Sequence, residues 1–277
     1  MALIEIDRLV SHYASSSGPI LNNINLSIDR GEYLVLLGAN GSGKTTLLRH
    51  LNALLIPRTG RVLVDGLASS DLENRIPIRR KVGMVFQSPE DQIVAATVEQ
   101  EVAFGLENIA YPEEQLEKAV IEALEMVGME QARKASPFEL SPGELQRVAV
   151  AAVTAMNPDC VLFDEATSMI DPRGRRDLLQ LMRRLKDRGI SVVSVTHEVE
   201  EALEADRIVV LQRGRVAAEG APAELFARTD LERFGLLAPE AIDFSRRLRR
   251  VGLPVLETLD EEALAADLEA LKKGVEG

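Results

Sequence analysis

The chain lacks several features that would define its class at once. Its 277 residues include a single cysteine, Cys160, so no disulfide can form within the chain, and the flanking PDCVLFDE predicts a buried strand position for it. No run of residues approaches the roughly 20 apolar positions of a membrane-spanning helix. The start, MALIEIDRLV, has neither the basic segment nor the long apolar segment of an export signal, so we expect no export.

Positive charge is also scarce. Lys and Arg number 32 against 44 Asp and Glu, which gives a net charge of −12. This balance argues against broad electrostatic binding to nucleic acid or to anionic lipid. The most basic stretch, SRRLRR at 245–250, is most simply the solvated face of a helix.

What the chain does contain is an alternation of apolar strands with helical segments. Residues 1–35 read as short alternating strands, and EYLVLLG, VGMVF, CVLFDE, ISVVSVTH and RIVVLQRG as strands buried on both faces. A helical region is expected at about 95–158, and a polar helical stretch from 221 onwards. This order predicts an α/β fold with an open, mostly parallel sheet that binds ligands beyond the carboxyl ends of its strands.

A glycine-rich loop joins one predicted strand to the helix that follows it. GANGSGKTT (38–46) matches G-x-x-x-x-G-K-[ST], in which backbone N–H groups wrap phosphates at a helix N-terminus. Lys44 is expected to neutralise the β- and γ-phosphates, and the Thr45 hydroxyl to bind Mg²⁺. The predicted nucleotide-binding residues are Gly38, Ala39, Asn40, Gly41, Ser42, Gly43, Lys44, Thr45 and Thr46. In the following helix, leucines at 47, 48, 51, 54 and 55 are expected on one buried stripe. Elsewhere in the chain, Met156 and Met169 are expected in the core.

Two acids end a later strand, in CVLFDEATS (160–168). Asp164 at the strand tip can hold magnesium through water, and Glu165 is placed to orient and deprotonate an attacking water. Adjacent acids at a strand tip also occur by chance. Together with the upstream phosphate loop, the pair favours hydrolysis of a nucleoside triphosphate.

Between these motifs, LSPGELQRVAVAAVTAMNPD (140–159) resembles the signature segment of the ABC ATPases, usually written L-S-G-G-Q. With it, Asp171 in SMIDP resembles the family's D-loop, and His197 after SVVSVT its switch histidine. Gln87 matches the Q-loop glutamine, which in that family reaches the magnesium and the attacking water. Tyr13 corresponds to the aromatic residue that stacks on adenine. Taken alone, Gln87 could be an ordinary loop residue, His197 structural and Tyr13 a packing aromatic.

The resemblance covers about residues 3–220 and has implications for the whole chain. It implies a P-loop NTPase core with an N-terminal antiparallel β subdomain, an inserted helical subdomain at about 95–158, and dimers that bind ATP and Mg²⁺. Residues 221–277 resemble a C-terminal helical extension that contacts its counterpart in a second ATPase. The family uses the signature segment on the nucleotide of the opposite subunit.

The signature segment departs from the family's pattern at two positions. Pro142 replaces the first glycine and cannot donate a hydrogen bond, because proline has no N–H. Glu144 replaces the glutamine, a common variant. Ser141 and the Gly143 amide remain available for a phosphate.

A narrower resemblance joins FQSPEDQIVAATVEQEVAFGLEN (86–108), DEATSMIDP and RRVGLPVLETLDEEAL. Together they resemble the ATPase subunits of energy-coupling factor transporters, which take up vitamins or transition metals in prokaryotes. The resemblance implies a peripheral position on the cytoplasmic face of the cell membrane. It also implies three partners: a second ATPase, a membrane coupling subunit and a substrate-binding membrane subunit. Glu90 and Asp91 would line the groove for the coupling subunit, unless they form a plain solvated acidic turn.

Two other functions are compatible with these motifs. One is the ATPase of a conventional ABC importer. The other is a soluble ABC ATPase associated with nucleic acid, against which stand the single cassette and the acidic balance, so we expect no nucleic-acid partner. The transported substrate and the choice between homodimer and heterodimer stay open.

Overall fold

The computed structural model describes residues 1–13 and 18–275. Its centre is a six-stranded sheet in the order β10-β9-β3-β8-β7-β6, in which β9, β3, β8, β7 and β6 run parallel and β10 is antiparallel to β9. The strands are β3 (Tyr33–Leu37), β6 (Val82–Val85), β7 (Cys160–Asp164), β8 (Ser191–Val195), β9 (Arg207–Gln212) and β10 (Arg215–Gly220). The predicted α/β fold with a mostly parallel sheet is confirmed.

The continuous apolar strands are buried because both faces of this sheet are covered. Along β3, Leu34 and Leu36 pack in one core, whereas Val35 and Leu37 pack in the other. Cys160 is fully buried on β7, as predicted, and burial raises the pKa of its thiol. Successive residues of a strand face opposite cores, so a strand buried on both faces is apolar at every position.

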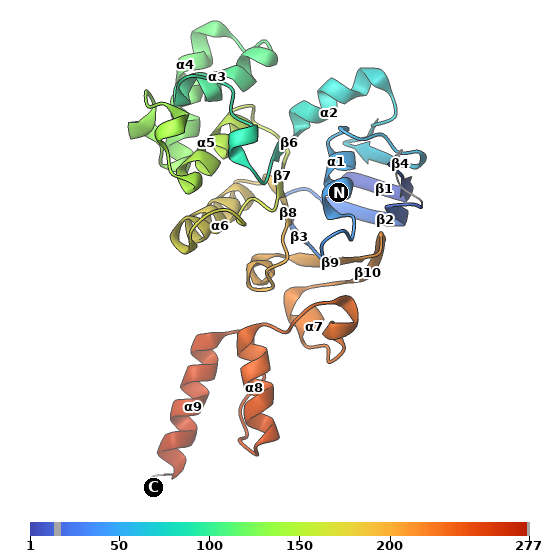
Figure 1. Ribbon diagram of the computed structural model, residues 1–277, viewed down its shortest axis with the longest axis vertical. Helices are drawn as coiled ribbons and strands as arrows, with labels where there is room; N and C mark the ends of the chain where they lie inside the picture. The colour runs from blue at the N-terminus through green and yellow to red at the C-terminus, as the bar shows by residue number, and fades with distance from the viewer. Residues whose placement is uncertain (14–17, 276–277) are drawn as a thin grey trace.

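An antiparallel sheet in the order β2-β1-β4-β5 packs through one of these cores. Its strands are β1 (Ala2–Ser11), β2 (Leu21–Asp29), β4 (Thr59–Val64) and β5 (Leu67–Ala68). Helix α1 (Lys44–Leu51) contributes Leu47, Leu48 and Leu51 to the same core. Figure 1 shows α1 between this sheet and the central one.

Helices cover the other face of the central sheet. Helices α3 (Val98–Asn108) and α4 (Glu113–Val127) pack on α5 (Pro142–Thr154), and α5 and α6 (Pro172–Asp187) pack on the strands. The first three lie within the predicted helical region at 95–158 and stand together at one end of the molecule (Figure 1). The division of the chain into domains stays a prediction.

The last part of the chain is helical, as expected. It contains α7 (Pro222–Phe226), α8 (Glu240–Arg250) and α9 (Glu261–Val275). Helices α8 and α9 lie side by side and project away from both sheets (Figure 1). A small core of Ala241, Val255 and Leu264 joins them.

Short elements complete the described chain. They are α2 (Arg75–Lys81) and the 3-10 segments η1 (Leu72–Asn74), η2 (Pro89–Asp91), η3 (Glu130–Ala132), η4 (Pro137–Glu139), η5 (Glu200–Glu204) and η6 (Leu231–Phe234).

Two packing predictions were wrong. The leucine stripe ends at Leu51, where α1 ends; Ala53 turns the chain at φ 55° and Leu54 is 42% exposed. Met169 is 58% exposed, because it follows the end of β7 in a loop outside the core.

Candidate nucleotide-binding and catalytic site

The carboxyl ends of β3, β7 and β8 bring the predicted residues to one edge of the central sheet. The phosphate loop follows β3, Asp164 ends β7 and His197 lies two residues beyond β8. The backbone N–H of Glu165 donates to the carbonyl of Val195 at 3.1 Å, which ties the ends of β7 and β8 together. Neighbouring parallel strands thus collect side chains that are far apart in the sequence.

The phosphate loop depends on glycines with left-handed backbone angles. Gly41 and Gly43 have φ values of 77° and 107°. A Cβ atom at Gly43 would lie 2.8 Å from the Leu21 side chain and 3.1 Å from the Ile20 carbonyl oxygen. Both the angle and the lack of space therefore require glycine at the start of α1.

Lys44 lies inside this loop and is only 5% exposed. Its Nζ donates to the carbonyls of Gly38 at 2.7 Å and Ala39 at 3.2 Å, and lies 3.9 Å from Glu165 Oε1. Burial lowers the pKa of Lys44, while the charges of Glu165 and Asp164 oppose that shift. The loop therefore holds a buried cation with its own carbonyl dipoles.

The cavity beside Lys44 fits a polyphosphate. It has a volume of about 190 Å³ and is lined by Ile20, Asn40, Gly41, Gly43, Lys44, Thr45, Thr46 and Glu165. Within the described residues, the buried Ser42 Oγ of the same loop has no hydrogen-bond partner. An orphaned hydroxyl, a buried ammonium and a glycine loop at a helix N-terminus together suit an anion.

Thr45 and Asp164 form the candidate magnesium position. The Thr45 hydroxyl donates to Asp164 Oδ1 at 2.8 Å. Burial raises the pKa of Asp164, and the hydrogen bond from Thr45 works in the opposite direction. Among the residues described, no three His, Cys, Asp or Glu side chains gather into a metal cage. Two oxygen ligands beside a phosphate site are the setting that Mg²⁺ uses, with phosphates and water completing its shell.

Glu165 and Gln87 meet at the same edge. Glu165 has a φ of 50°, a strained value for this residue type that is found at functional sites. The Gln87 amide donates to Glu165 Oε2 at 3.4 Å and to Ser168 Oγ at 3.2 Å. Glu165 thus lies between Lys44 and Gln87, and its role as the general base stays a prediction.

The loop that carries Gln87 is anchored by residues that sequence reasoning missed. Phe86 donates its backbone N–H to Gln92 Oε1 at 3.2 Å, and its carbonyl accepts from Gln146 Nε2 of α5 at 3.1 Å. Gln146 is 1% exposed. A buried amide within the apolar run LQRVAV was the available signal, because such a group needs a partner.

His197 and Tyr13 lie at the margins of the site. The His197 side chain is 51% exposed, and its Nε2 lies 3.5 Å from Glu198 Oε1 instead of next to Glu165. The Tyr13 hydroxyl lies 3.2 Å from Thr46 Oγ1, which places the end of its side chain beside the phosphate loop. Their roles stay predictions.

The signature residues form the N-terminus of α5. Ser141 caps the helix, and Glu144 Oε2 accepts from the Ser141 hydroxyl at 2.7 Å and from its backbone N–H at 2.9 Å. Pro142 stands at the first helical position, where an N–H is not needed within the helix. Asp171 caps α6 by accepting from the Arg173 and Gly174 amides at 2.9 and 3.2 Å. These two caps line another cavity, of about 290 Å³, which has no lining residue in common with the phosphate cavity.

Glu90 and Asp91 lie on η2, directly after the loop of Gln87, and both are exposed. Asp91 lines a cavity of about 570 Å³ that reaches Gln87, Thr45 and Asp164. Glu90 does not line it. The segment expected to receive a partner therefore lies next to the candidate magnesium position.

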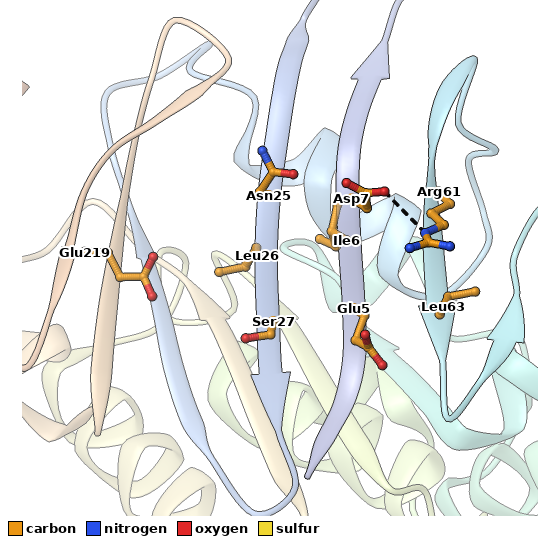
Figure 2. Close-up of a pocket in the computed structure, with 9 residues that line it drawn as sticks. All are labelled: Glu5, Ile6, Asp7, Asn25, Leu26, Ser27, Arg61, Leu63 and Glu219. Carbon is orange, nitrogen blue, oxygen red and sulfur yellow. Dashed lines mark ion pairs between the residues drawn. The ribbon is translucent and has the colours of Figure 1, made fainter.

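A further pocket lies on the outer face of the antiparallel sheet (Figure 2). The carboxylates of Glu5, Asp7 and Glu219 line it, and Arg61 pairs with Asp7 at 3.4 Å. Carboxylates repel a polyphosphate, so this pocket is not the nucleotide site.

Comparison with known proteins agrees with this geometry. The sequence profile of the ABC transporter family matches residues 21–168, slightly more than half of the chain. The chain belongs to the ABC transporter ATPase family. It is 49% identical over 256 residues to the energy-coupling factor transporter ATP-binding protein EcfA1 of Symbiobacterium thermophilum, covering 90% of this chain and 89% of that protein. It therefore belongs to the energy-coupling factor branch, as predicted, and is an ATP-binding subunit that couples ATP hydrolysis to transport.

Two solved structures are similar over most of the chain. One is cbiO1 of Clostridium perfringens, described as part of the ABC transporter complex cbiONQ, with a TM-score of 0.77, 33% identity, and coverage of 91% of this chain and 97% of that one. The other is a dimeric ATP-binding cassette in a post-hydrolysis state bound to ADP and Pi, with a TM-score of 0.72, 31% identity, and coverage of 79% and 98%. The P-loop NTPase fold expected from the sequence is thereby confirmed.

In the part of the chain that the structure describes, no helix is long and apolar enough to cross a bilayer.

Proposed function

We propose that this chain binds Mg²⁺·ATP at the end of the central sheet and hydrolyses it to energise an importer of a vitamin or a transition-metal ion. The observation that supports this most is the convergence of Lys44, Asp164, Glu165 and Gln87, which come from three separate segments, on one edge. Electrostatic positioning of this kind supplies most of the catalysis in phosphoryl transfer.

Each residue has a role in the hydrolysis of ATP to ADP and phosphate. Lys44 and the loop amides bind the β- and γ-phosphates, and Tyr13 stacks on the adenine. Glu165 accepts a proton from the attacking water, while Gln87 and His197 orient that water against the γ-phosphate. Thr45, Asp164 and Gln87 hold Mg²⁺, which supplies positive charge toward the phosphate oxygens when bound.

The chain acts as one of two ATPase subunits, a paralogue or a second copy, at the cytoplasmic face of a prokaryotic cell membrane. Ser141, Gly143 and Glu144, with Asp171 beside them, face the nucleotide of the opposite subunit. Glu90 and Asp91 receive basic side chains of a membrane coupling subunit, which also binds a membrane protein that captures the substrate.

Two substitutions separate nucleotide binding from hydrolysis. Glu165→Gln keeps the shape of the side chain but removes its basicity, so we expect ATP binding to be retained and hydrolysis to fall about 10²–10⁴-fold. Lys44→Ala removes phosphate charge neutralisation, so ATP binding itself weakens. Turnover by purified protein and affinity for fluorescent ATP are the two measurements.

Glu114→Gln, on the exposed first turn of α4, serves as the control and should change neither quantity. Wild-type turnover in Glu165→Gln would remove Glu165 from the mechanism. Purification from native membranes tests the partners: a substrate-binding membrane subunit supports the proposal, and a periplasmic binding protein indicates a conventional ABC importer.

A further inference from the structure

Arg49 lies one helical turn after Thr45 on α1 and is half-buried. It lines the cavity of about 570 Å³ that also contains Asp164 and Asp91. Throughout residues 1–13 and 18–275, no hydrogen bond or ion pair involves the Arg49 guanidinium. A half-buried guanidinium beside two carboxylates has electrostatic attraction to both.

The two carboxylates differ in what else they do. Asp164 is buried and accepts a hydrogen bond from the Thr45 hydroxyl. Burial raises the pKa of Asp164, and the charge of Arg49 is among the influences that lower it. Asp91 is exposed and lies on η2, the segment that follows Gln87. Arg49 therefore shares one cavity with the candidate magnesium position and with the segment expected to dock a partner.

We propose that Arg49 is a positioning residue that links metal binding at Asp164 to Asp91 on η2. A divalent cation at Thr45 and Asp164 repels the guanidinium, which then pairs with Asp91. Without the cation, Arg49 is drawn toward Asp164 and leaves Asp91 free. This inference rests on the proposed function, because it takes the nucleotide-bound metal to lie at Thr45 and Asp164.

Linkage makes this relation testable from the Asp91 side. The Arg49–Asp91 pair, if it forms in the metal-bound state, raises the affinity for the metal by some factor. Removal of the Asp91 charge must then lower that affinity by the same factor. Without Asp91, the guanidinium has only Asp164 as a partner and competes with the metal there. Without Arg49, Asp91 acts on the metal only through its own charge across the open cavity, so its removal should have a much smaller effect.

The test uses the full chain, Mn²⁺ in place of Mg²⁺, and a non-hydrolysable ATP analogue. The affinity for the analogue is measured by calorimetry, once with Mn²⁺ and once with a chelator. The ratio of the first affinity to the second isolates the metal's contribution. Asp91→Asn should lower this ratio about fivefold, the scale of one unit charge acting across a partly screened cavity. In the Arg49→Gln background, the same Asp91→Asn change should alter the ratio by less than about twofold.

Glu90→Gln is the matched control, because it removes a charge from the same short segment but does not line the cavity. Arg49→Met, which keeps the aliphatic stem, provides a second background in case the glutamine variant folds poorly. An Asp91→Asn effect that persists without Arg49, or that equals the Glu90→Gln effect, overturns the link. If the wild-type chain does not bind the analogue at all, the proposed function fails instead.

Discussion

At the scale of single residues, the helix behind the phosphate loop is held by a buried histidine. His50, in the last turn of α1, is fully buried, and its Nε2 lies 2.8 Å from Ser11 Oγ on β1. Burial lowers the pKa of His50 to about 4, from the ordinary 6.5. The folded chain therefore prefers neutral His50, while the unfolded chain takes up a proton below pH 6.5.

This shift predicts a loss of stability in mild acid. A depressed pKa gives stability that is present above pH 6.5 and lost as the pH falls toward 4. By pH 5, we expect the free energy of unfolding to fall by about 2 kcal/mol through His50 alone. Urea unfolding at pH 7, 6 and 5 measures it, with His50→Gln as the comparison. An equal decline in both proteins would show that other groups cause it.

Residues that belong to a recognisable motif could be predicted, and residues outside any motif could not. Lys44, Thr45 and Asp164 follow from local patterns, and they converge as expected. Arg49 and Gln146 belong to no such pattern, because the groups they face come from distant segments. The contact of Gln146 and the proposed role of Arg49 arise only from the three-dimensional arrangement.

At the scale of elements, the loop between β6 and η2, which contains Phe86 and Gln87, links the helices to the site. The carbonyl of Phe86 is held by α5, its N–H is held by Gln92, and Gln87 contacts Glu165. A movement of this loop would reach the carboxylate of Glu165 directly. The segment FQSPEDQ therefore connects the proposed docking surface to the proposed general base.

Glu90 allows docking to be tested apart from nucleotide binding. Because Glu90 is exposed and lies outside the cavity beside Asp164, Glu90→Lys should leave the affinity for Mg²⁺·ATP within about twofold. It should weaken assembly with the membrane coupling subunit, because like charges would then oppose basic side chains. Glu114→Lys on α4 is the matched control for a charge reversal. Co-purification of the complex is the measurement, and undiminished assembly would make Glu90 an ordinary surface residue.

Element type was predictable where periodicity was strong, and element length was less so. The buried strands and α4 follow their patterns. Helix α1 is shorter than its leucines indicate, because periodicity cannot show that Ala53 adopts a left-handed turn. Apolar spacing describes which face is buried if a helix forms, and backbone turns decide where it stops.

At the scale of the whole molecule, the chain has the parts of a nucleotide site in two places. Lys44 and Glu165 line the phosphate cavity, whereas Ser141 and Gly143 line the cavity between α5 and α6. The order of motifs along the chain does not reveal this separation, because Ser141 and Gly143 lie between Lys44 and Glu165 in the sequence. We propose that the signature of one chain completes the site of another, which encloses the γ-phosphate and excludes bulk water.

Mixing two inactive variants tests that claim most directly. Ser141→Arg blocks the signature surface, and Glu165→Gln removes the base, so homodimers of either variant carry a defect in every site. In a mixed dimer, one site receives both defects and the other receives none. ATPase activity after equimolar mixing should therefore rise to about a quarter of wild type, since random pairing makes half the dimers mixed and each retains one working site. If the signature and the base act within one chain, every site stays defective and mixing restores nothing.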